Sequence, residues 1–321
     1  MSQILVADIG GTNARFAIVA PENGAISGCR DVRQFRCADF PDFPTLIATY
    51  LGSLGSRPTA ACLALAAPIR GPVVRLTNLD LVVDAIDLER RFAFDKVTLV
   101  NDFAALALSV LHLGDEDIAP IRMTGEGGAG PVSVMGPGTG FGASLLVPSE
   151  RGCVMVPTEA GHQTFAPVGD IEIEIAAFMH RRQKHLSVEN MMSGSGLCAI
   201  HRALAAISGR SPESLTAEAI ATAAAQGDAS CGETLRTFFA MLGSVAGDLA
   251  LAHGATGGVF IGGGIVMNNL AFLEQSAFET RFLDKGLMRN YVERIPVAAI
   301  RSFEAALIGS AHWYLAQGRM H

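Results

Sequence analysis

The sequence lacks the features of several functional classes. Its six cysteines form no C-x-x-C pair, which argues against a zinc site or a dithiol redox motif. The longest apolar run, Ala60 to Ile69, falls far short of the roughly 20 residues that a membrane-spanning helix needs. The first residues have neither the basic stretch nor the cleavage site of a signal peptide. We therefore expect a cytoplasmic protein with free thiols.

Charge is also scarce in this chain. Charged residues make up 17% of the sequence and hydrophobic residues 50%, a balance that disfavours intrinsic disorder. The formal net charge is −7, so we expect neither nonspecific nucleic-acid binding nor attachment to an acidic membrane. The 321 residues are enough for about two domains, each with its own core.

Two segments of the chain share one pattern. Residues 3–20 (QILVADIGGTNARFAIVA) and 132–147 (VSVMGPGTGFGASLLV) both read as an apolar strand, a glycine-rich turn with a threonine, and a second apolar strand. A duplicated α/β domain would explain this repeat, whereas a chance likeness of two hairpins is the alternative. The repeat predicts two α/β domains that face each other.

Further elements follow from apolar spacing and from helix-ending signals. A short strand at Lys96–Val100 leads into Asn101-Asp102, which puts a carboxylate at the carboxyl end of a strand, where open α/β sheets bind ligands. The other expected elements are a buried strand at residues 258–261 and helices at residues 103–113, 170–185, 232–253 and 302–317.

The two glycine-rich turns are candidate phosphate sites. Glycines let backbone N–H groups approach a phosphate, a threonine hydroxyl adds a donor, and an aspartate can hold Mg²⁺ through water. The residues concerned are Asp8, Gly10, Gly11, Thr12 and Asn13 in the first turn and Gly138, Thr139 and Gly140 in the second. A P-loop motif is absent, and a dinucleotide fingerprint at residues 138–143 is disfavoured because the chain continues as a strand instead of opening a helix.

Three acids and one histidine are candidates for binding and catalysis. Asp102 suits a general base for phosphoryl transfer, which needs a carboxylate to orient the attacking hydroxyl and accept its proton; alternatively it only caps the next helix. Glu159 and His162 lie on either side of Gly161 and suit recognition of neighbouring sugar hydroxyls, unless this segment is a surface loop. Glu189 carries no signal of its own.

Placed in order, these segments resemble the bacterial glucokinase family, within the superfamily of sugar kinases, actin and the heat-shock chaperone ATPases. The likeness runs nearly end to end through ADIGGTNARFAI, TLVNDFAAL, GPGTGFGASLL, PTEAGHQTFAP, SVENMMSGSG and GGVFIGGGIV. The resemblance implies a two-domain α/β fold of the actin-like ATPase (ribonuclease H-like) type with a cleft between the domains. It implies a small domain of residues 1–113 and 302–321, a large domain of residues 114–301, and a homodimer.

The resemblance also implies a reaction and its residues. The reaction is transfer of the γ-phosphoryl group of MgATP to the C6 hydroxyl of glucose, with Asp102 as the base. Asp8 would serve Mg²⁺, and the two glycine-rich turns would hold the phosphates. The sugar would meet Asn101, Asp102, Glu159, His162 and Glu189, and the adenosine would meet Gly262, Gly263 and Gly264.

Two departures from the family pattern bear on sugar preference. The family's SGPG segment is Ser193-Gly194-Ser195-Gly196 here, and Leu79-Asp80-Leu81 follows Thr77-Asn78 where the family usually has an aromatic residue.

The alternatives are a kinase for another hexose or one that also uses polyphosphate, an actin- or chaperone-like ATPase without a sugar substrate, and a sugar-responsive regulator without catalysis. The ATPase would have no reason to carry the sugar residues. The regulator would normally bring a DNA-binding helix-turn-helix, for which residues 1–9 leave no room.

Overall fold

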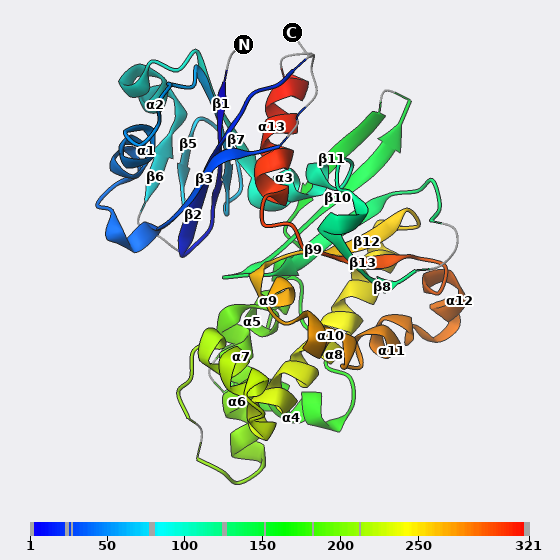
Figure 1. Cartoon of the computed structure of the whole chain (residues 1–321). Helices are drawn as coiled ribbons and strands as arrows, with labels where there is room; N and C mark the ends of the chain where they lie inside the picture. Colours follow the sequence, from blue (N-terminus) through cyan, green and yellow to red (C-terminus); the bar gives the residue numbers. More distant parts are fainter. Residues whose placement is uncertain are drawn as a thin grey trace. The chain divides into compact units, whose positions relative to one another are not determined.

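The computed structural model describes residues 3–22, 26, 28–76, 81–123, 127–150, 152–181, 183–211 and 213–317. The chain forms two compact units, Met1–Gly114 with Ser302–His321 and Asp115–Arg301, whose elements are labelled in Figure 1. From the sequence, the division was expected after residue 113, with the return to the small domain at residue 302. Thr77, Asn78, Leu79 and Asp80, where the sequence departs from the family pattern, lie outside the described residues.

The small unit is built on one sheet whose strands lie in the order β3-β2-β1-β4-β7. Its strands are β1 (Ile4–Ile9), β2 (Asn13–Val19), β3 (Arg30–Arg36), β4 (Ala60–Leu65) and β7 (Lys96–Asn101), with a separate ribbon of β5 (Val73–Arg75) and β6 (Val82–Asp84). Its helices are α1 (Phe43–Leu51), α2 (Ala85–Phe92), α3 (Asp102–Ser109) and α13 (Ala305–Gln317).

Side-chain alternation along β1 explains why helices cover both faces of this sheet. Leu5, Ala7 and Ile9 pack in one cluster with α1, whereas Ile4 and Val6 pack in another with Leu307 and Ala311 of α13. Successive strand residues point to opposite faces, so a strand such as β1, which is apolar at every position except Asp8, must be covered on both sides. The C-terminal helix therefore completes the small unit.

The register of the parallel strands brings three chain ends to one edge of the sheet. Ile9 pairs with Leu65, and Leu65 pairs with Asn101, so β1, β4 and β7 end side by side. Open α/β sheets bind ligands at the carboxyl ends of their strands. The segments after Ile9 and after Asn101 therefore leave the sheet at the edge where a ligand is expected.

The large unit is built on a sheet with the strand order β11-β10-β9-β12-β13-β8. Its strands are β8 (Ile118–Arg122), β9 (Val132–Pro137), β10 (Phe141–Ser149), β11 (Gly152–Thr158), β12 (Gly258–Ile261) and β13 (Val297–Ile300). Its helices are α4 (Asp170–His180), α5 (Val188–Met191), α6 (Gly194–Ile207), α7 (Ala217–Ala225), α8 (Ala229–His253), α9 (Gly264–Met267), α10 (Leu270–Glu274), α11 (Phe278–Leu283) and α12 (Arg289–Val292).

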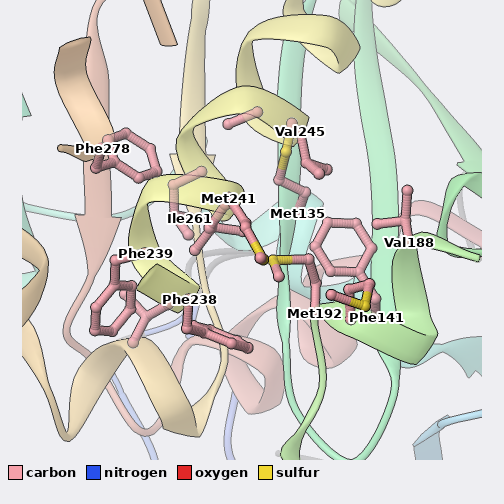
Figure 2. Close-up of a cluster of buried hydrophobic side chains, with 14 of the residues drawn as sticks. Met135, Phe141, Val188, Met192, Phe238, Phe239, Met241, Val245, Ile261 and Phe278 are labelled. Carbon is pink, nitrogen blue, oxygen red and sulfur yellow. The ribbon is translucent and has the colours of Figure 1, made fainter. Parts of the chain in front are cut away.

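Helix α8 organises the core of this unit. Phe238, Phe239 and Val245 of α8 gather in one cluster with Met135 of β9 and Ile261 of β12 (Figure 2). The helix ends at Gly254, whose φ of 58° is the left-handed conformation that glycine adopts most readily. Among the described residues α8 alone is long and apolar enough to cross a membrane, and most of it is buried in the core. The apolar spacing in the sequence predicted this helix and its end.

The structure confirms both predicted hairpins and corrects one helix. β1 pairs antiparallel with β2, and β9 pairs antiparallel with β10. The helix expected to reach His185 ends at His180. Beyond it, the Phe165 N–H donates to the Leu186 carbonyl (2.9 Å) and Thr164 forms a bridge with Ser187. This long-range pairing holds Leu186 and Ser187 in an extended segment, so the chain leaves the helix several residues earlier and tertiary pairing overrides the local helical pattern.

Helices α3 and α13 meet through two histidines. The imidazole rings of His112, just after α3, and His312, on α13, stack with centroids 3.3 Å apart and planes 3° apart. Burial, with a smaller contribution from His112, lowers the pKa of His312 to about 4, and burial also lowers the pKa of His112. Both rings are therefore neutral at neutral pH.

We expect the small unit to lose stability in mild acid through this pair. The folded state holds the His312 pKa below its ordinary value near 6.5, so the stabilisation is complete above that pH and is lost as the pH falls towards 4. His312→Phe keeps a flat ring that cannot titrate. As the pH falls from 7 to 5, the parent should lose more melting temperature than His312→Phe, so the difference between variant and parent should grow in favour of the variant. His180→Asn, at an exposed position, should show no such trend. Parallel pH profiles for His312→Phe and the parent would contradict this assignment.

Candidate active site

The first glycine-rich turn joins β1 to β2. The Gly10 N–H donates to the Asn13 carbonyl (2.9 Å), which closes the turn. The Cys37 N–H donates to the Thr12 carbonyl (2.9 Å), and the Cys37 thiol lies 3.8 Å from the Gly10 carbonyl oxygen. Thr12 and Asn13 remain exposed. The turn is thus held by its backbone, and its exposed polar residues are able to meet a phosphate.

Asp8 stands opposite Arg15 across this hairpin. The Arg15 guanidinium lies 3.9 Å from the Asp8 carboxylate and also donates to the Phe303 carbonyl (2.6 Å) and to the Gln34 side chain (3.1 Å). Burial raises the pKa of Asp8, and the Arg15 charge opposes that rise. Arg15 was not identified from the sequence as a partner of Asp8. The predicted hairpin could have indicated it, because the two residues are nearly equidistant from the centre of the turn.

The surroundings of Asp8 fit a Mg²⁺ ion held through few protein ligands. Among the residues with described positions, no group of three or more histidines, cysteines or acids is close enough together to hold a metal. Mg²⁺ usually keeps several waters and binds through one or two carboxylates together with substrate phosphates. A single carboxylate beside the predicted phosphate turn suits that pattern.

Asn101 and Asp102 start helix α3 at the same sheet edge as Asp8. The Asn101 Oδ1 accepts the Ala104 N–H (3.1 Å), so Asn101, and not Asp102, is the N-cap. One Asp102 oxygen, Oδ1, accepts hydrogen bonds from the Asn101 Nδ2 (3.0 Å) and the Phe103 N–H (2.9 Å). The reading of Asp102 as the helix cap is therefore wrong, and its carboxylate is held in a fixed orientation.

In the large unit, the second glycine-rich turn meets the segment after β12. The Gly262 N–H donates to the Met135 carbonyl (2.8 Å). A Cβ at Gly136 would overlap the Gly262 carbonyl, and one at Gly263 would overlap the Pro137 carbonyl. Gly264 then begins α9. The end of β9, which leads directly into the predicted phosphate turn, is therefore in backbone contact with the predicted adenosine segment, at a spacing that side chains would prevent.

The Glu159–His162 segment forms a short 3-10 turn after β11. Its two functional side chains are 63% and 66% exposed, and the Glu159 Oε2 lies 3.9 Å from the His162 Nε2. His185 Nε2 lies 3.3 Å from the His162 carbonyl oxygen. The pair is exposed and close enough for both side chains to contact one small polar ligand.

Glu189 lies on α5, whose start is fixed by a reciprocal capping box between Ser187 and Asn190. Its Oε2 accepts the N–H of Phe141 (2.9 Å), the residue that follows the Gly138–Gly140 turn. The nearby Gly194 N–H donates to the Gly138 carbonyl (2.9 Å). The structure therefore joins Glu189 and the Ser193–Gly196 segment to the phosphate turn, a relation that the sequence did not indicate.

Comparison with known proteins places these features in one family. The family model described as Glucokinase matches residues 5–317. The glucokinase of Saccharophagus degradans is 36% identical over 98% of this chain and 98% of its own length. The glucokinase of Chromobacterium violaceum is 41% identical over 96% of this chain and 88% of its own length.

Solved structures show the same fold. A glucokinase from an Antarctic psychrotroph is similar with a TM-score of 0.82, 36% identity and 98% of each chain covered. A glucokinase from Balamuthia mandrillaris, solved in complex with glucose, has a TM-score of 0.82 at 23% identity, covering 99% of this chain and 94% of that one. These neighbours support the two-unit actin-like ATPase fold expected from the sequence.

Replacing Asn101 separates its capping role from its contact with Asp102. Asn101→Ala removes the acceptor for the Ala104 N–H and should cost about 0.5–2 kcal/mol of unfolding free energy. Asn101→Ser keeps an acceptor at the cap without adding a charge beside Asp102, and it should lose less. Urea denaturation monitored in the small unit would measure both, and equal losses for the two variants would show that the cap contributes nothing.

Proposed function

Because the chain belongs to the glucokinase family, we propose that it transfers the γ-phosphoryl group of ATP to the C6 hydroxyl of glucose to give glucose 6-phosphate. The observation that carries this proposal is the Asn101-Asp102 pair at the carboxyl edge of the small-unit sheet. Two donors orient one oxygen of the Asp102 carboxylate there. Phosphoryl transfer asks little covalent chemistry of a protein, but it does need such a carboxylate beside the attacking hydroxyl.

Asp102 is the general base of the proposed reaction. It accepts the proton of the C6 hydroxyl as that oxygen attacks the γ-phosphorus, while the bond between the γ-phosphorus and the β,γ-bridging oxygen breaks and ADP leaves. The Asn101 amide and the Phe103 N–H hold the carboxylate so that little reorganisation is needed during attack.

The phosphates of ATP are held by the Gly10–Asn13 and Gly138–Gly140 turns, and the adenosine lies against Gly262, Gly263 and Gly264. In the large unit, Gly262 and Gly263 pack against the backbone of β9 just before the Gly138–Gly140 turn, which supports the joint use of the two segments for one nucleotide. ATP use is also supported by a Streptomyces griseus glucokinase of the ROK family, a fold neighbour with a TM-score of 0.68, which was solved with glucose and AMPPNP.

Asp8 holds Mg²⁺ in this proposal, through water. A bound Mg²⁺ would neutralise charge on the phosphates that it contacts. The partly buried Asp8 carboxylate, close to the Gly10–Asn13 turn, supports the assignment because Mg²⁺ usually binds through one or two carboxylates together with substrate phosphates. Arg15 balances the same carboxylate and tethers it to the segment that precedes α13.

Glucose is bound by Asn101, Glu159, His162 and Glu189. Glu159 and His162 offer a carboxylate and an imidazole within 3.9 Å of each other, which matches neighbouring hydroxyl groups on a ring. Binding energy at hydroxyls remote from C6 would help to place the C6 hydroxyl for attack.

We also propose that the enzyme is cytoplasmic and forms a homodimer. All six cysteines are free thiols, and Cys153 is exposed, which suits the reducing cytoplasm. The family resemblance implies a homodimer, which light scattering coupled to size-exclusion chromatography would detect.

ADP release tests the proposed reaction. The parent protein is assayed with ATP against a panel of hexoses, with Mg²⁺ and with excess chelator. Glucose should give the highest kcat/KM, and chelation should abolish turnover. Hexose-independent ATP hydrolysis would instead favour an actin- or chaperone-like ATPase, and preference for another sugar would favour a different hexose kinase.

The base assignment makes a quantitative prediction. Asp102→Ala should lower kcat by about 10²–10⁴ while glucose affinity falls much less, because the side chain acts mainly in the transition state. Asp87→Ala, which removes a carboxylate from a surface ion pair on α2, is the matched control. Near-normal turnover of Asp102→Ala would refute this role.

The sugar assignment makes another. Glu159→Ala and His162→Ala should each lower kcat/KM for glucose by roughly tenfold to a hundredfold, the cost of leaving a polar partner unpaired, and leave ATP binding nearly unchanged. Glu174→Ala and His180→Ala, at exposed positions on α4, are controls of the same residue types. Titration calorimetry in which both site variants bind glucose like the parent would make this loop structural.

A further inference from the structure

One hydrogen bond joins the predicted sugar carboxylate to the predicted phosphate turn. The Phe141 N–H donates to the Glu189 Oε2 at 2.9 Å, and Phe141 directly follows Gly138-Thr139-Gly140. Phe141 and Val188, the neighbour of Glu189 on α5, also belong to the same buried cluster (Figure 2). The short helix that carries Glu189 is therefore anchored to the end of the phosphate turn by a hydrogen bond, and it shares a buried apolar cluster with Phe141.

The space for the Glu189 carboxylate exists because residue 140 is glycine. A Cβ at position 140 would overlap the Glu189 Oε2, which is the far end of a flexible side chain. A Cβ at Gly138, two residues earlier in the same turn, would have nothing within 4 Å. Neither glycine has a positive φ, so alanine suits the backbone at both positions. An added methyl at 140 would thus displace the carboxylate rather than the turn.

The segment with Glu159 and His162 approaches the same residue from another direction. A Cβ at Gly161 would overlap the Phe141 carbonyl oxygen. The backbone of Phe141 therefore contacts Glu189 through its N–H and Gly161 through its carbonyl. Both sugar-binding segments of the large unit rest on the residue where the phosphate turn ends.

We propose that the phosphate turn positions the sugar carboxylate: the Phe141 N–H holds Glu189, and the absence of a side chain at Gly140 leaves room for its carboxylate. Gly140, which belongs to the predicted phosphate turn, and Phe141, which follows that turn, are then positioning residues for glucose. This inference rests on the proposed function, because it takes Glu189 as a glucose ligand. The inference also implies that the coupling between glucose binding and nucleotide binding is reciprocal, because the loss of the Glu189 carboxylate removes a hydrogen-bond partner of the phosphate turn.

Calorimetric titration of glucose into nucleotide-free protein tests this positioning. Gly140→Ala should weaken glucose binding by roughly tenfold to a hundredfold, because a displaced carboxylate leaves a sugar hydroxyl unpaired. Gly138→Ala should bind glucose like the parent. In the double variant Gly140→Ala/Glu189→Ala, affinity should equal that of Glu189→Ala alone, because the first change acts only through Glu189.

The outcomes separate this inference from the proposed function. A parent protein that does not bind glucose would overturn both. A parent that binds glucose while Gly140→Ala and Gly138→Ala behave alike would overturn only the positioning role, and so would additive losses in the double variant.

A second measurement serves if Gly140→Ala fails to fold. Without glucose, Glu189→Ala should bind a nonhydrolysable ATP analogue several-fold more weakly than the parent, since the turn has lost its support, whereas Glu159→Ala should not. Equal analogue affinities in these two variants would overturn the positioning role.

Discussion

Backbone contact without intervening side chains is the constraint on which the large-unit site depends. Gly136 lies against Gly262 and Gly263 against Pro137, at distances that a Cβ would forbid, and Gly140 leaves room for the Glu189 carboxylate, which a Cβ would displace. These contacts bring two segments that are distant in sequence to one hairpin, β9–β10. Because β9 also lies beside β12 in register, the segments that follow both strands leave the sheet at the same edge. The segments that we propose for nucleotide and for sugar binding therefore both contact the β9–β10 hairpin.

The small unit reaches a comparable result through strand register. Asp8 and Asn101 lie at the ends of β1 and β7, with β4 between them, and the pairing fixes both chain ends at one edge. Helix α13 secures this sheet from one face, and Arg15 ties Asp8 to the segment leading into that helix. The carboxylates that we propose for Mg²⁺ and for the proton thus lie on one sheet, which suits a reaction that depends on positioning.

Local pattern was enough to predict much of this fold, and the reason is physical. Both hairpins, β12 and the long helix α8 follow from apolar periodicity and glycine signals, which act within a few residues. The end of α4 did not follow, because it depends on pairing between Thr164 and Ser187, which local spacing does not encode. Glu189 was indicated only by family resemblance, since its partner is a backbone N–H and leaves no mark in the sequence. The alternative that Asp102 caps α3 could not be decided from the sequence for a similar reason: Asn101 and Asp102 are both good caps, and only the structure shows that Asn101 is the N-cap.

In the large unit, one hydrogen bond from the Phe141 N–H couples the proposed sugar carboxylate of Glu189 to the proposed phosphate turn. Amide hydrogen exchange at Phe141, measured by NMR in the ligand-free protein, tests this coupling most directly, because the Phe141 N–H is the donor of the hydrogen bond to Glu189. We expect slow exchange of the Phe141 amide in the parent and clearly faster exchange in Glu189→Ala, while the amides of α8 exchange equally slowly in both proteins. Equal protection of the Phe141 amide in both proteins would contradict it.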